Sequence, residues 1–158
     1  MSRRDQITMS DDEVLAFLDE ERTLVCATAG PRGWPHLMPL WYVVRDGRIW
    51  AWTFAKSQKT KNLERDPRAT LQVEAGETYD QLRGVMLECE TVIHRDLETV
   101  SALGTEVFRR YTPGIGDGPL PDAMQAAVDQ QATKRIAMEF VERRRATWDH
   151  RKLAAGVY

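Results

Sequence analysis

Apolar and polar residues alternate along much of the chain, which is the pattern of strands that bury one face. In the stretch 83–94, for example, Val85, Leu87 and Cys89 alternate with polar residues such as Glu88 and Glu90. Alternation, β-branched residues and turn signals together predict six strands, over residues 23–29, 35–45, 48–54, 69–75, 83–94 and 134–148. We therefore expect a mainly β protein.

A tight turn separates the second of these runs from the third. Asp46 and Gly47 form a two-residue hairpin signal between the stretches 35–45 and 48–54. Because the preceding run, 23–29, is joined to 35–45 by another short turn, we expect the first three strands to form an antiparallel meander.

Helix signals occur at the ends of this strand region and between its parts. Ser10, with Glu13 three residues later, matches a capping box, and Asp96 precedes a stretch with helical spacing. The predicted helices cover about 9–21, 58–65, 97–111 and 122–131. So few helices between six strands exclude a doubly wound parallel sheet. The pattern favours one domain over residues 1–158, a six-stranded antiparallel barrel with peripheral helices.

Composition and charge narrow the classes of partner. A net charge of -2 over 158 residues gives no general attraction to nucleic acid or to acidic lipid. The longest nearly uninterrupted apolar run, residues 37–44, is far shorter than the ~20 residues of a membrane span. The start of the chain lacks the apolar region of a signal peptide. We expect a soluble, cytoplasmic protein, with Cys26 and Cys89 as reduced, buried thiols.

The segment 55–68 is locally basic in a chain that is acidic overall. Five Lys and Arg residues face only Glu64 and Asp66, and a Ser stands where the expected helix begins. Backbone N–H groups at a helix start, a hydroxyl and ammonium groups together suit a phosphate group. The alternative is a solvated basic helix face without a ligand.

An apolar wall of aromatic residues leads into this basic segment. Trp41 and Tyr42 lie on one predicted strand, and alternation places Trp50, Trp52 and Phe54 on one face of the next. Tryptophans in strands commonly form a core or a dimer interface. Next to a phosphate site, however, an apolar slot favours a flat aromatic cofactor with a phosphate tail.

Other catalytic and metal motifs are not found in the sequence. The three histidines, His36, His94 and His150, are widely separated and belong to no metal-binding motif. No serine stands in a nucleophile-elbow motif. The glycine-rich stretch 112–121 follows a helix instead of a strand, so we interpret it as a loop or lid. We assign no metal ligand and no catalytic side chain.

The order of elements and several motifs resemble a known family. The stretches PHLMPLWYVVRDG, IWAWTFAKSQKTKNLERDPRATL and LRGVMLECE resemble the pyridoxamine 5'-phosphate oxidase-like split barrels, which bind flavin nucleotides. KTKNLERDPR, YDQLRGV and TWDHRKL are similar to the actinobacterial branch that uses the deazaflavin coenzyme F420. The resemblance implies an FMN-binding type of split barrel and a homodimer with two cofactor sites at the subunit interface.

The resemblance also implies which residues bind the cofactor. The phosphate-binding turn corresponds to Lys56, Ser57 and Lys59, supported by Asn62. Trp148 and Arg151 are the candidates for a Trp and an Arg near the C-terminus that approach the flavin. The strands that line the ring correspond to Met38, Leu40, Trp41, Trp52 and Thr53.

The expected activity follows from this assignment. We expect an F420-dependent oxidoreductase that transfers hydride between the bound deazaflavin and a small organic acceptor, with the cofactor carrying the chemistry. Alternatives are an FMN-dependent enzyme similar to pyridoxamine phosphate oxidase, or a non-catalytic protein that binds a cofactor, a tetrapyrrole or a fatty acid. The C-terminal motif by which the true oxidases bind pyridoxal phosphate is not recognisable in this sequence.

Overall fold

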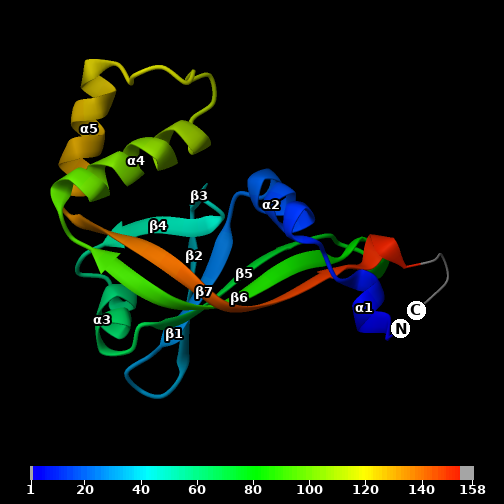
Figure 1. Ribbon diagram of the computed structural model, residues 1–158. Coiled ribbons are helices and arrows are strands. Elements are labelled where there is room, and N and C mark those ends of the chain that lie inside the picture. Colours follow the sequence, from blue (N-terminus) through cyan, green and yellow to red (C-terminus); the bar gives the residue numbers. More distant parts are fainter. Residues whose placement is uncertain (1, 154–158) are drawn as a thin grey trace.

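The computed structural model describes residues 2–153 and places seven strands of this stretch in one antiparallel sheet (Figure 1). The strands are β1 (Leu24–Ala29), β2 (Pro35–Leu40), β3 (Val43–Arg45), β4 (Arg48–Phe54), β5 (Arg68–Ala75), β6 (Arg83–His94) and β7 (Arg135–Asp149). The α-helices are α1 (Arg3–Ile7), α2 (Asp11–Glu20), α3 (Gln58–Arg65), α4 (Leu97–Tyr111) and α5 (Asp122–Ala132). Two short 3-10 helices are η1 (Tyr79–Gln81) and η2 (His150–Lys152).

The strand order forces the sheet to curl. The order is β2-β1-β5-β6-β7-β4-β3, so β2 and β3 stand at the two ends of the sheet. Only Trp41 and Tyr42 join these two strands, and so short a link spans no more than about 11 Å. The ends of the sheet must therefore lie close together. β2 makes no ladder with β3 or β4 among the described residues, so the barrel stays open at this place.

The strand predicted over 35–45 is divided in the structure, which gives seven strands instead of six. The backbone N–H of Tyr42 donates to the Tyr111 hydroxyl at 2.9 Å, and the Tyr42 hydroxyl donates to the Leu18 carbonyl at 2.6 Å. These bonds hold the backbone away from a sheet ladder. The predicted meander is wrong for the same reason, because β2 pairs with β1 while β3 pairs with β4.

Local signals for turns and caps are confirmed. Asp46 and Gly47 have positive φ angles of 50° and 74°, as the two central residues of a type I′ hairpin require, and they join β3 to β4. Ser10 caps α2: the Glu13 N–H donates to its hydroxyl, and its own N–H donates to the Glu13 carboxylate. Asp96 caps α4 by accepting from the Thr99 N–H at 3.0 Å.

The core has two parts. Inside the barrel, α2 packs its apolar side against inward-facing strand residues, and the largest buried side chains there include Phe17, Tyr42 and Phe140. Outside the barrel, α4 and α5 pack against β4 and β7, around Leu103 and Val107. Figure 1 shows these two helices as a pair at one end of the molecule, with α1 at the opposite end.

Both cysteines are buried and unbonded. Burial raises the pKa of Cys26 to about 12 and likewise raises that of Cys89 to about 12. Neither thiol is activated as a nucleophile, because the thiolate is the reactive form. No helix within residues 2–153 is long and apolar enough to cross a membrane.

Candidate functional site

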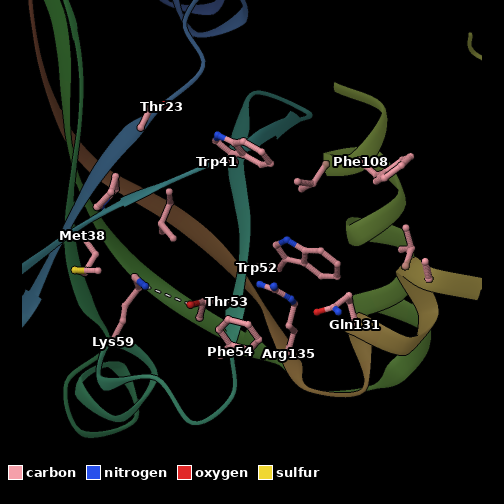
Figure 2. A pocket seen from close by; sticks show the side chains of 15 residues that line it. Thr23, Met38, Trp41, Trp52, Thr53, Phe54, Lys59, Phe108, Gln131 and Arg135 are labelled. Atoms are coloured by element: carbon pink, nitrogen blue, oxygen red, sulfur yellow. Dashed lines mark hydrogen bonds between the residues drawn. The ribbon is translucent and has the colours of Figure 1, made fainter. Parts of the chain in front are cut away.

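A cavity of about 710 Å³ lies at the opening of the barrel, where β2 and β4 face each other without pairing (Figure 2). Strands β2 and β4, helices α3, α4 and α5, and the first residue of β7 all contribute to it. Its lining is Thr23, Met38, Pro39, Leu40, Trp41, Trp52, Thr53, Phe54, Lys59, Val107, Phe108, Ala127, Val128, Gln131 and Arg135. The surface is mostly apolar, and its only charged side chains are a Lys and an Arg.

Strand β4 divides this cavity into two sides. Trp52 and Thr53 are successive strand residues, so their side chains face opposite ways. Figure 2 shows Thr53 directed toward Lys59 and Trp52 directed toward α4 and α5. The cavity therefore joins the barrel mouth, where Lys59 lies, to a slot beneath the helix pair.

Lys59 is a buried cation without a counter-ion among the described residues. Only 5% of its surface is exposed, and its Nζ donates to the Thr53 hydroxyl at 3.3 Å. None of the ion pairs within residues 2–153 includes it. Desolvation lowers the pKa of Lys59 from its usual value. An anionic ligand would stabilise this charge, which makes Lys59 the best candidate for binding a phosphate or carboxylate.

The turn before α3 holds Lys59 in this position. Ser57 is the N-cap of α3, and its hydroxyl accepts from the Thr60 N–H at 3.2 Å. The Thr60 hydroxyl in turn donates to the Phe54 carbonyl at 2.9 Å. These bonds tie the first turn of α3 to the end of β4. As a result, Lys59 points back over the barrel mouth instead of into solvent.

Asn62 anchors α3 to the sheet. Its side chain is fully buried; the amide nitrogen donates to the Thr28 hydroxyl at 3.0 Å and the amide oxygen accepts from Gln58 at 2.8 Å. Both contacts are within the protein, and Asn62 is not among the cavity residues. The supporting role that the resemblance implies for Asn62 in cofactor binding stays a prediction.

Aromatic side chains form the walls at the opening. Trp41 stacks on Tyr111 of α4, with the ring centroids 4.5 Å apart, and stays more than half exposed. Trp52 packs against the backbone of α4 at Gly104, where an added Cβ would lie 2.4 Å from the indole. Gly104 is therefore what permits α4 to lie this close to the indole of β4.

The cavity brings together six of the ten residues predicted to bind a cofactor. These six are Met38, Leu40, Trp41, Trp52, Thr53 and Lys59. Lys56, Ser57 and Asn62 lie in or next to the turn that supports Lys59, with Lys56 exposed at the surface. The predicted aromatic wall is found only in part: Trp41, Trp52 and Phe54 line the cavity beside the basic turn. Tyr42 is buried in the barrel core, and Trp50 stacks on His94 outside the cavity lining.

Trp148 does not reach this cavity within one chain. It lies at the far end of β7, roughly 35 Å along the strand from the residue that pairs with Trp52. There it covers Gly84 of β6, whose added Cβ would lie 2.2 Å from the indole. Its neighbour Arg151 pairs with Asp149 at 2.7 Å. Figure 1 shows this end of β7 near α1, away from α4 and α5.

Arg135 is the charged cavity residue that the sequence analysis did not single out. It stands in the run KRIAMEF, where alternation places it on the face opposite Ile136 and Met138. Its link to the site depends on strand register, because Arg135 is the cross-strand partner of Phe54. Alternation gives the face of a residue in a strand but not the strand it pairs with. The α4 and α5 residues of the cavity were missed for a similar reason.

A second cavity, of about 690 Å³, lies around Trp34 on the other side of the β1–β2 hairpin. Its lining mixes acidic and basic side chains, among them Asp66, Arg68, Glu90 and Arg143. Arg68 pairs with Asp66 and Arg143 pairs with Glu90, so these charges already satisfy one another. The residues predicted to bind a cofactor are absent from its lining.

Comparison with known proteins places this geometry in a family. A family model of pyridoxamine 5'-phosphate oxidase matches residues 10–144. No curated protein matches the sequence. A crystal structure of a conserved hypothetical protein from Mycobacterium tuberculosis is 43% identical, with a TM-score of 0.86 over 99% of this chain and 98% of that one.

More distant structures share the fold alone. An F420 reductase is 18% identical, with a TM-score of 0.62 over 83% of this chain and 94% of that one. A heme storage protein from Vibrio cholerae is 14% identical, with a TM-score of 0.65 over 87% of this chain and 92% of that one. The match of the family model over most of the sequence, together with an antiparallel barrel open between β2 and β4, shows that the chain belongs to the pyridoxamine 5'-phosphate oxidase family.

Proposed function

We propose that this protein is an F420-dependent oxidoreductase that transfers hydride between the bound deazaflavin and a small organic acceptor. The observation that carries the proposal is Lys59, a buried ammonium with no acidic partner within residues 2–153, at the mouth of an apolar cavity walled by aromatic rings. A flat, mostly apolar ring system that ends in an anionic group is the ligand that such a surface fits. An F420 reductase among the structures of the same fold agrees with this proposal.

The residues present fit such a cofactor. Lys59 and Thr53 would bind its phosphate, and Met38, Leu40 and Trp41 would line the ring. When bound, the deazaflavin supplies the hydride chemistry. The chain binds and orients the ring and excludes water from one side of it. No acid–base pair is required of the protein, and none is found among the residues that line the cavity.

The distribution of positive charge favours F420 over FMN. Lys56 and Lys61 are exposed on the same turn and helix that hold Lys59 inside. Three separate cations suit the tail of F420, which carries a phosphate and further carboxylates, whereas a single phosphate clamp would suffice for FMN. We propose FMN only as the weaker ligand of the same cavity.

We also propose that the protein is a homodimer. Strand β2 ends the sheet, and its residues Leu37 and Met38 are 58% and 45% exposed. Trp34 and Trp41, on either side of β2, are exposed as well. A row of large apolar side chains on an edge strand is typical of a surface that another chain covers. A dimer is also the arrangement in which Trp148 could reach a cofactor in the other copy.

The proposal is tested by comparing F420 and FMN directly. Fluorescence titration of the protein with each cofactor should give a lower dissociation constant for F420. When the protein is mixed with reduced deazaflavin and a panel of acceptors, hydride transfer to an acceptor should regenerate the oxidised cofactor, and the rise in its absorbance measures turnover. Tenfold tighter binding of FMN, which corresponds to about 1.4 kcal/mol, would reverse the assignment. Tight binding of the cofactor with no turnover of any acceptor, or preferred binding of haem, would favour a storage protein.

A further inference from the structure

The guanidinium of Arg135 lies between two aromatic rings. Its central carbon is 4.5 Å from the ring centroid of Trp52 and 4.1 Å from that of Phe54. Arg135 begins β7 and pairs in register with Phe54 of β4, which places the three side chains on one face of the sheet. Figure 2 shows the guanidinium beside Trp52, with the side chain of Gln131 from α5 next to it. The backbone and two rings thus fix the position of this cation.

No anionic group of the described chain balances Arg135. Within residues 2–153 the guanidinium takes part in no ion pair, and its Nε is buried without a hydrogen-bond partner. The fifteen residues that line the cavity include no Asp or Glu. Burial also lowers the pKa of Arg135, although an arginine stays charged at neutral pH. Its N–H groups are therefore the strongest donors left to a ligand on this side.

Arg135 and Lys59 serve different sides of the cavity. Thr53, the partner of Lys59, and Trp52, the partner of Arg135, face opposite ways on β4. An anionic group that binds at the barrel mouth would contact Lys59. An anionic group in the slot beneath α4 and α5 would contact Arg135. One compact phosphate cannot occupy both positions, so the two cations indicate two anionic groups.

Apart from Arg135 and Gln131, the slot beneath α4 and α5 is apolar. Its walls are the rings of Trp52, Phe54 and Phe108 and the aliphatic side chains of α4 and α5. Such walls suit a flat hydrocarbon body rather than a sugar or a peptide. A guanidinium presents its N–H groups in its own plane, where a carboxylate can accept two of them.

We propose that Arg135 binds the carboxylate of the acceptor substrate, and that this substrate is a flat, apolar organic acid. The proposal rests on the proposed function for the identity of the second reactant. It adds a substrate class and a residue that determines specificity. Gln131 lies beside the guanidinium and would donate to the same carboxylate from α5.

The test uses 2-naphthoate and its uncharged analogue 2-naphthamide as probes. Both have the same flat body, so a difference in affinity reports the carboxylate. Calorimetric titration is carried out with and without saturating F420, on the wild-type protein and on Arg135→Gln. The matched control is Arg144→Gln, an arginine of the same strand whose side chain is 70% exposed and far from the slot.

Wild-type protein and Arg144→Gln should bind naphthoate at least tenfold more tightly than naphthamide. Arg135→Gln should lose this preference and keep its affinity for F420. Arg135→Lys, which keeps the charge without the planar fork, should retain a reduced preference, and it carries the test if the glutamine variant does not fold. Equal binding of both probes by the wild-type protein, or an undiminished preference in Arg135→Gln and Arg135→Lys, would overturn the proposal.

The cofactor titration separates this inference from the proposed function. Weaker F420 binding by Arg135→Gln with an unchanged naphthoate preference would assign the guanidinium to the cofactor and refute a role in acceptor binding. If no variant binds F420, the proposed function fails. The naphthoate preference would then still decide whether Arg135 is the carboxylate site.

Discussion

Lys59 is kept inside the protein at a cost in stability. Its ammonium is almost fully buried and has one hydroxyl partner, the side chain of Thr53. We expect Lys59→Met, which retains the length of the chain without the charge, to raise the free energy of unfolding by about 1 kcal/mol at neutral pH. The exposed Lys61→Met on the same helix should leave stability unchanged. Urea denaturation of the three proteins measures this difference.

The extra stability of Lys59→Met over the wild-type protein should become smaller as the pH rises. Desolvation makes the pKa of Lys59 lower in the folded protein than in the unfolded chain, so between the two values the unfolded chain binds more protons. In the pH range between these two pKa values, the stability of the wild-type protein therefore increases with pH. Lys59→Met lacks the group, and the two proteins should converge above neutral pH. A methionine variant less stable than wild type at pH 7 would show that Lys59 is structural.

The sequence indicated Lys59 but not the features that make it a site. The sequence and the family resemblance both placed Lys59 in a basic turn beside strands that carry aromatic residues. Its burial and missing counter-ion depend on how α3 folds back, and they are visible only in three dimensions. Arg135 was missed because its role depends on its register with Phe54, and Trp148 lies at a distance that residue type alone does not reveal.

At the scale of elements, short sequence signals predicted helix starts and a hairpin turn correctly, whereas the pairing of strands that are distant in sequence was not predicted. Ser10, Asp96 and Asp46 with Gly47 identified two helix starts and a hairpin, because caps and tight turns depend on a few adjacent residues. The break at Tyr42 was not predictable. It follows from hydrogen bonds to Leu18 and Tyr111, which are remote in sequence.

The contact between α4 and β4 depends on Gly104. Inside a helix, alanine is normally more stabilising than glycine by about 1 kcal/mol. At Gly104, however, the new Cβ would lie 2.4 Å from the Trp52 indole and 3.0 Å from Val128 of α5. We expect Gly104→Ala to lower the free energy of unfolding by about 1–3 kcal/mol, because the overpacked helix must move. Thermal or urea denaturation measures the loss in the free energy of unfolding. Tryptophan emission, used as the probe, also reports the displacement of the Trp52 indole.

Ala102 provides the control for helix propensity. It is exposed on the same helix, so Ala102→Gly should cost about 1 kcal/mol through propensity alone. If Gly104→Ala instead stabilised the protein by a similar amount, Trp52 would not be wedged against α4. The wall of the slot would then be free to move.

At the scale of the whole molecule, the proposed homodimer explains the exposed edge strand. We expect the wild-type protein to sediment as a dimer at micromolar concentration and Leu37→Asp to sediment as a monomer, because an aspartate on β2 would be buried unpaired. Leu15→Asp, at an exposed apolar position on α2, should remain dimeric. A stable wild-type monomer well above the dissociation constant of the cofactor would refute the proposed assembly.

The overall architecture could largely be predicted from the sequence, but the way in which the sheet curls into an open barrel could not. An antiparallel, mainly β fold with peripheral helices follows from the alternation of residues and the shortage of crossover helices. That β2 and β3 lie at opposite ends of one sheet, and that the barrel opens between β2 and β4, depends on the choice of partners by seven strands. This opening creates the cavity, so the position of the site could be inferred only together with the topology.

The central claim is that Lys59 holds the anionic part of a cofactor in this cavity. Equilibrium dialysis of F420 against the wild-type protein, Lys59→Met and the control Arg144→Gln, an exposed cation outside the cavity, tests it most directly. Loss of a charge-assisted hydrogen bond of about 1.5–3 kcal/mol should weaken binding by Lys59→Met roughly tenfold to a hundredfold, while Arg144→Gln stays within threefold of wild type. Wild-type affinity in Lys59→Met, or no binding of F420 to the wild-type protein, would contradict the account.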